Sequence, residues 1–331
     1  MNRRTIIGLG ILAVPLCALS DALAQQDTKV YVIGYLGQGP LAESRTPGQP
    51  LSSLLRHLRD AGYIEGVNLK VEARFAEGRP EKLAPLAAEL VRANPRVIAV
   101  ASAGLAEVVM QHTTTIPVVA LQAGQLEAEP RVHSLAKPGG NLTGMQLHSP
   151  ELIGKRLQLL HDVVPGLKRV AVLRGVPFAG PGFELYRNAN DAAAARLGIR
   201  ARYLQFEKPA ELPKLFEDMA KQGDQALLVW GNPHLNAYRK EIFALTMQHR
   251  LPALYDVRGY REELLVYTAK MEDVHREGAT YVDRILKGAN PGDLPIGQAK
   301  SFELIVNLKT AKTLGITVPQ AVILRANEVI E

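Results

Sequence analysis

The hydrophobic positions of the chain alternate between short continuous runs and stripes in which they recur every three or four residues. The run VYVIGYL at 30–36 is apolar on both faces, which is typical of a strand in a parallel sheet that is covered on both sides. In the next segment, 50–62, four leucines between positions 51 and 58 follow the spacing of one helical face. Strand-like and helix-like segments continue to alternate in this way, which predicts a parallel α/β sheet with right-handed crossovers.

The same rhythm occurs twice along the chain. The strands predicted in the first series are 30–36, 68–75, 97–102, 117–122 and 141–147. A helix predicted over 151–166 opens the second series, whose strands are 169–175, 200–206, 226–231, 252–256 and 264–269. A long helix, a strand at 302–307, a further helix and a short tail close the chain. The pattern therefore predicts two Rossmann-like units of similar size, without a repeat at the level of individual residues.

The first 24 residues follow a different pattern. Arg3 and Arg4 precede an uncharged apolar stretch at 5–19, and the small residues of ALA at 22–24 come directly before Gln25. This order is typical of a signal peptide that is cleaved after residue 24, by Sec or twin-arginine export. The apolar stretch is shorter than the roughly 18 residues that a membrane-spanning helix needs. We therefore expect export to the periplasm.

Composition narrows the function further. Apolar residues make up 47% and charged residues 22% of the chain, as in ordered globular proteins. Aromatic residues are only 5%, and the net charge of +6 is spread without a basic cluster, so a nucleic-acid partner is not expected. The only cysteine, Cys17, lies in the predicted signal peptide. The exported chain therefore has no disulfides, thiol nucleophiles or cysteine-ligated metals.

The motifs of several enzyme classes are missing from the sequence. Gly37 and Gly39 lack GxGxxG spacing, and neither GxxxxGK[ST], HExxH nor GxSxG occurs. The sequence therefore predicts no cofactor and no metal ion. An exported hydrolase that uses Ser102 remains an alternative, since this serine follows a predicted strand as a nucleophile would.

Polar residues at the carboxyl ends of the predicted strands are the candidates for a site, because ligands of open parallel sheets bind there. Ser102 either caps the next helix, where a carboxylate can also bind, or acts as the nucleophile. Gln122 either binds a ligand or satisfies local backbone groups. In the second unit, Arg174 either pairs with an anion or lies on the surface, and Asn232 points to the same edge.

Two further candidates in the second unit also have two interpretations. Phe178 either covers an apolar ligand group or packs on its own unit. Asp256 either accepts a ligand ammonium or caps a following helix. Two exported units without catalytic motifs indicate capture of a small solute between lobes. A sensory subunit that presents its closed form to a membrane receptor is a further alternative.

Four segments resemble one known family. They are LAKPGGNLTGMQ at 135–146, GKRLQLLHDVVPGLKRVAVL at 154–173, the long segment at 281–316 and LRANEVIE at 324–331. Together they are similar to the substrate-binding proteins of ABC transporters that are often called tryptophan/tyrosine-type and have a type 1 periplasmic binding protein fold. The resemblance extends over nearly the whole chain after residue 29.

This resemblance implies two lobes that close on a hinge and deliver an amino acid or small carboxylate to a permease driven by an ATPase. It places one lobe at 29–147 with about 268–295, and the other at 148–267 with about 300–331. By position, it implies that the ligand contacts are Gln38, Ser102, Ala103, Gln122, Phe178, Asn232 and Asp256.

Overall fold

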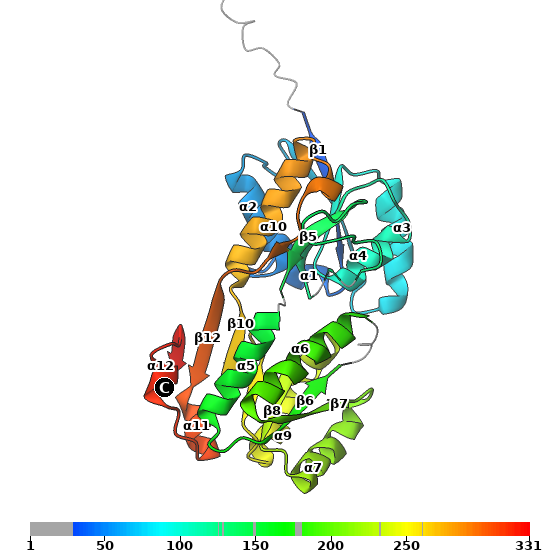
Figure 1. The fold of residues 1–331 in the computed structure, drawn as a ribbon. Helices are drawn as coiled ribbons and strands as arrows, with labels where there is room; N and C mark the ends of the chain where they lie inside the picture. The colour runs from blue at the N-terminus through cyan, green and yellow to red at the C-terminus, as the bar shows by residue number, and fades with distance from the viewer. Residues whose placement is uncertain are drawn as a thin grey trace, which may run out of the picture.

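The computed structural model contains two α/β lobes, each built on its own sheet (Figure 1). It describes residues 29–124, 126–127, 129–147, 150–175, 181–231, 233–259 and 261–331. The predicted signal peptide, 1–24, lies outside these residues. Within the described ranges, no helix combines the length and the apolar character needed to cross a membrane.

The first lobe is built on a parallel sheet in which neighbouring strands are far apart in sequence. Its described strands follow the order β11 (Gly297–Gln298), β5 (Leu142–Gln146), β4 (Val118–Ala123), β3 (Val97–Val100), β1 (Tyr31–Gly37) and β2 (Leu69–Phe75). One face is covered by α2 (Pro50–Asp60) and α10 (Met271–Leu286). The other face is covered by α3 (Leu83–Arg92) and α4 (Ala103–Met110). The short α1 (Leu41–Ser44) follows β1, and η1 (Pro80–Lys82) and η3 (Pro291–Asp293) are single 3₁₀ turns.

The second lobe contains a seven-stranded sheet among the described residues. Its order is β13 (Glu328–Ile330), β12 (Phe302–Asn307), β10 (Leu265–Ala269), β9 (Ala253–Tyr255), β8 (Ala226–Trp230), β6 (Arg169–Arg174) and β7 (Arg200–Gln205). The pairing of β10 with β12 is antiparallel, whereas the other pairings of this sheet are parallel. One face packs against α5 (Pro150–Val163), α6 (Pro181–Leu197), α11 (Leu308–Leu314) and α12 (Gln320–Ile323). The other packs against α7 (Leu212–Gln222), α8 (Pro233–Ala237) and α9 (Arg239–Gln248), and η2 (Pro209–Glu211) is a 3₁₀ turn directly before α7.

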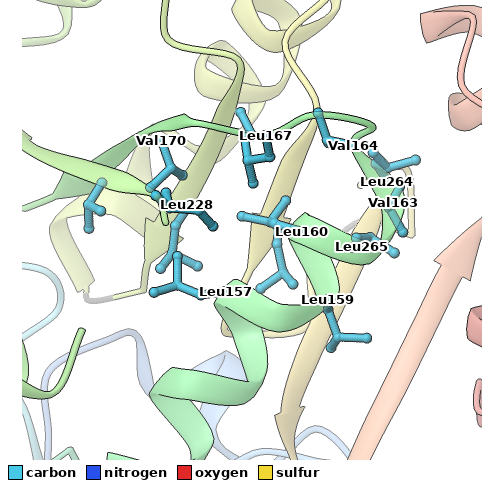
Figure 2. Close-up of a cluster of buried hydrophobic side chains, with 14 of the residues drawn as sticks. Leu157, Leu159, Leu160, Val163, Val164, Leu167, Val170, Leu228, Leu264 and Leu265 are labelled. Carbon is cyan, nitrogen blue, oxygen red and sulfur yellow. The ribbon is translucent and has the colours of Figure 1, made fainter. Parts of the chain in front are cut away.

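The hydrophobic core of the second lobe explains the helical spacing of the apolar residues in α5. Leu157 and Leu160 of α5 gather with Val170 of β6 and Leu228 of β8 in one buried cluster (Figure 2). All four side chains are fully buried, at 0% exposure. Burying a leucine or valine side chain contributes about 1.5–3 kcal/mol each, so the helical stripe fixes the face of α5 that meets the sheet.

The chain passes between the two sheets three times within the described ranges. It leaves β5 for α5, leaves β10 for α10, and leaves β11 for β12. The last two passages lie side by side, since the backbone N–H of Lys270 donates to the carbonyl of Ser301 at 2.9 Å. The hydroxyl of Ser301 donates to Asp273 Oδ2 at 2.7 Å, which ties the start of α10 to the same passage. These two crossing segments run in opposite directions, next to the antiparallel pair of β10 and β12, and short connections of this kind are common hinges between lobes.

The structure confirms the predicted fold class, two Rossmann-like α/β lobes joined by crossing segments. Most predicted strand ends agree with the structure to within one or two residues. The sequence pattern missed the two-residue strand β11 and the terminal strand β13. Both are too short to show a periodicity of their own.

Candidate functional site

The carboxyl ends of β1, β3 and β4 form one edge of the first sheet. The strands are parallel neighbours in the order β4-β3-β1, so the residues that follow them lie next to each other. Figure 1 shows α1, which follows β1, on the side of the first lobe that faces the second lobe. The four candidates of the first lobe lie at this edge: Gln38, Ser102, Ala103 and Gln122.

Ser102 is the N-cap of α4. Its Oγ accepts a hydrogen bond from the backbone N–H of Leu105 at 3.3 Å, and its backbone is extended. The predicted capping role is therefore confirmed. Ala103 is the first residue of α4, and both residues are half-buried. The first turn of α4 leaves backbone N–H groups at the end of β3, where they favour a negatively charged group.

The side chain of Gln122 contacts α10, the helix that covers one face of the first sheet. Its Oε1 lies 2.6 Å from Nε2 of His275 on α10. His275 is only 3% exposed, and burial lowers the pKa of its imidazole to about 4. At neutral pH the ring is uncharged and has a single N–H, which it donates to the amide oxygen.

Gln38 is held through its backbone. Its carbonyl accepts a hydrogen bond from the N–H of Gly78 at 2.8 Å, and its residue is half-buried. Phe75, the last residue of β2, is also half-buried. Its ring centroid lies 5.8 Å from the ring centroid of Tyr35. Sequence reasoning missed Phe75. Its position as the last residue of a predicted strand was the available signal, because it pairs in register with Gly37.

The loop after β4 is shaped by Gln146. Its Oε1 accepts hydrogen bonds from the backbone N–H groups of Leu126 at 2.8 Å and Glu127 at 3.3 Å. Gln146 is 1% exposed and lies at the end of β5, next to β4. Gln146 thus helps to hold the loop after β4 at the same edge. Nothing in the sequence pattern marked it as different from other polar residues at strand ends.

In the second lobe, Arg174 ends β6 and is half-buried. Its guanidinium carbon lies 4.2 Å from the ring centroid of Phe183, in the first turn of α6. Phe183 also packs edge-on against Tyr203 and Trp230. The carboxyl end of this sheet therefore presents a cation backed by aromatic rings. Phe178 and Asn232, two of the candidates, lie outside the described residues.

Asp256 is enclosed within the second lobe. It is 3% exposed, and its Oδ1 accepts a hydrogen bond from the backbone N–H of Gly231. Its Oδ2 lies 3.5 Å from Nη1 of Arg156 and 3.5 Å from the hydroxyl of Tyr186. Burial raises the pKa of this carboxyl, while Arg156 opposes the rise. The helix-cap interpretation was wrong, because the described residues between β9 and β10 form no helix.

Arg156 is a residue that sequence reasoning missed. It belongs to α5, and its side chain is 1% exposed. Its Nη1 donates a hydrogen bond to the Tyr186 hydroxyl at 2.7 Å, and its Nε donates to the backbone carbonyl of Tyr267 at 3.1 Å. It joins α5, α6 and the sheet just after the chain enters the second lobe. A single arginine in an amphipathic helix is ordinarily exposed, so the pattern gave no signal for it.

A separate groove lies away from this edge. This groove of about 460 Å³ runs between α2 and α10 and is lined largely by ionisable side chains, among them Arg56, His57 and Glu272. Arg56 and Glu272 pair across it at 2.6 Å. Over the part of the chain that the structure describes, no three histidine, aspartate or glutamate side chains gather as metal ligands would.

Comparison with known proteins identifies a family. The profile of the ABC transporter substrate binding proteins matches residues 49–330. A protein of Clostridioides difficile (strain R20291) named tyrosine-binding protein is 21% identical over 286 residues, which cover 84% of this chain and 80% of that protein.

Solved structures share the fold. A crystal structure from Streptococcus pneumonia, described as an ABC domain in complex with L-Trp, superimposes with a TM-score of 0.80 at 21% identity, over 91% of this chain and 100% of that one. A conserved domain protein from Vibrio cholerae gives a TM-score of 0.80 at 24% identity, over 91% and 100% of the two chains. A glucose-galactose binding protein from Geobacillus stearothermophilus, at a TM-score of 0.61 and 12% identity over 84% and 98%, has the same two-lobed architecture.

Proposed function

The chain belongs to the family of ABC transporter substrate binding proteins, and from this membership we propose that it captures an amino acid between its lobes and delivers it to a membrane permease. Proteins of this family bind their substrates without transforming them, so the hydrolase alternative for Ser102 is set aside. The proposed ligand is an aromatic amino acid or a related small carboxylate. Two relatives support this choice by name, the tyrosine-binding protein and the structure that contains L-Trp.

The observation that carries the proposal is the chemistry of the two opposed sheet edges. The first lobe offers hydrogen-bond donors from the start of α4, next to Gln122 on the neighbouring strand. The second offers Arg174 and the ring of Phe183. Donors and a cation suit a ligand carboxylate, while aromatic rings suit an apolar side chain. Closure would remove water from both sides of such a ligand.

The remaining parts of the proposal concern lobe limits and location. We keep the lobes at 29–147 with about 268–295, and at 148–267 with about 300–331. The exported chain begins after residue 24 and works in the periplasm, with a permease and its ATPase as partners. The ligand contacts proposed for it are the candidates named above, Phe178 and Asn232 included.

Calorimetric titration of the purified protein tests the proposal. L-tryptophan, L-tyrosine and a panel of small carboxylates should include a ligand that binds with one-to-one stoichiometry. A ligand at 100 times its dissociation constant adds about 2.7 kcal/mol to the free energy of unfolding, which a thermal shift detects. Absence of binding across the panel, or chemical conversion of any of these compounds by the protein, would refute the proposal.

A further inference from the structure

Gln122 and His275 connect two elements at the carboxyl edge of the first sheet. Gln122 belongs to β4, and His275 lies in the second turn of α10. The imidazole is 3% exposed, whereas Gln122 is half-buried. The contact therefore runs from the interior of the lobe to a side chain at its surface.

The 2.6 Å contact fixes which end of the Gln122 amide faces outward. The amide oxygen has no proton, so Nε2 of His275 must donate. In a primary amide the oxygen and nitrogen branch in different directions. An oxygen turned toward the buried His275 leaves the NH₂ group of this half-buried side chain pointing away from α10, and among the described residues none accepts a hydrogen bond from it.

The surroundings of His275 keep its ring neutral, with one proton to donate. Burial is the main cause that lowers the pKa of His275 to about 4. The ionisable groups Glu272, His57 and Arg56 also act on this pKa: Glu272 favours protonation of His275, and the other two oppose it. A neutral ring that donates from Nε2 cannot also have a proton on Nδ1, so the hydrogen bond selects one tautomer.

Close packing brings the two residues together. Gly278, one turn after His275, lets α10 approach β4, because a Cβ at this position would lie 3.1 Å from Leu121 Cδ2. The pairing of β4 with β5 is irregular between Ala120 and Ala123, around Gln122. Irregularities of this kind change the direction of a side chain relative to a regular strand.

We propose that His275 is a positioning residue that holds the Gln122 amide with its two N–H donors toward the second lobe, and so selects ligands with a carboxylate at this point. The inference rests on the proposed function. A glutamine amide that nothing holds can rotate by about 180° and so present donors to a carboxylate, or a donor and an acceptor to a carboxamide. An amide held by His275 offers only donors, which match the two acceptor oxygens of a carboxylate better than the mixed groups of a carboxamide.

The first test needs no ligand. Nitrogen-15 NMR of the histidine rings at pH 7.5 should show His275, assigned from the signal lost in a His275→Gln variant, as the Nε2–H tautomer. A ring protonated on Nδ1 would mean that Gln122 donates to His275, which would overturn the inference.

The second test compares L-tryptophan with L-tryptophanamide by calorimetry. The ratio of their affinities should fall on the order of tenfold in His275→Phe, the effect of about one charge-assisted hydrogen bond. The control is His57→Phe, which changes another histidine beside α10, with a side chain 8% exposed, and should leave the ratio unchanged. If His275→Phe does not fold, Gln122→Met should weaken binding of L-tryptophan more than binding of L-tryptophanamide.

The outcomes separate the two proposals. Binding by the wild-type protein with an unchanged ratio in His275→Phe or Gln122→Met overturns the role of His275 alone. No binding of either compound by the wild-type protein counts against the proposed aromatic ligand, and the NMR measurement still decides the orientation of Gln122.

Discussion

The buried pair of Arg156 and Asp256 yields the sharpest prediction about stability. Both side chains are 1% exposed, with Nη1 and Oδ2 3.5 Å apart. Replacing Arg156 with Met leaves the carboxyl group buried, with Gly231 and Tyr186 as its remaining donors among the residues that the structure describes. Removal of one partner from a buried ion pair costs about 3–5 kcal/mol, so R156M should lose roughly this much free energy of unfolding.

A double-mutant cycle measures the coupling of the pair. D256N should also destabilise the protein, because it leaves the guanidinium without its carboxylate. The double variant R156M/D256N should lose clearly less than the sum of the two single losses, by about 2 kcal/mol or more. Urea unfolding followed by circular dichroism gives each value. Losses that simply add would show that the two groups act independently, contrary to the reasoning.

The dependence on pH adds a second readout for R156M. Burial already raises the pKa of Asp256, and loss of Arg156 raises it further. The folded state then binds a proton more readily than the unfolded state, so the defect should become smaller as the pH falls from 8 to 5. Arg187→Ala is a matched control, because its pair with Glu184 is 43% and 50% exposed and should contribute less than 1 kcal/mol at any pH.

Three further predictions use the same unfolding assay. Lowering the pH from 6.5 to 4 should reduce the free energy of unfolding by about 3 kcal/mol through His275. Its pKa is about 4 in the folded state and about 6.5 in the unfolded state, so the unfolded state takes up the proton first. A His275→Phe variant with the same pH profile as the wild type would contradict this. Gly144→Ala should lose about 3 kcal/mol or more, because φ is +142° and the new Cβ would lie 2.1 Å from the Ala120 carbonyl oxygen; a neutral effect would refute it. Leu160→Ala should lose about 2–5 kcal/mol by leaving a cavity at a fully buried site, whereas exposed Leu324→Ala, at 76%, should change little.

The sequence predicted the fold well because the sheets are buried on both faces. Continuous apolar runs such as 30–36 and helical stripes such as 50–60 carry enough signal to locate each element. The order of strands could not be predicted in the same way. The pairing of β11 with β5 joins residues about 150 positions apart, and the pattern of a two-residue strand does not encode such a contact.

The site was predicted only in part, for a physical reason. Strand ends located Ser102 and Gln122 at one edge, as the structure has them. The groups that hold these side chains are determined by tertiary packing. His275 reaches Gln122 from a helix that begins about 150 residues later, and Arg156 reaches Asp256 from across the lobe. Neither contact leaves a local pattern in the sequence.

The central claim is that the lobes close on a ligand, and a distance between them tests it most directly. The chain has no cysteine after Cys17, so spin labels can be attached at Ala84→Cys on α3 and Lys214→Cys on α7, both exposed and away from β12 (Figure 1). Double electron–electron resonance should give a shorter and narrower distance distribution when a ligand that calorimetry shows to bind is added to saturation. A distribution that stays the same with the ligand bound would contradict capture by lobe closure.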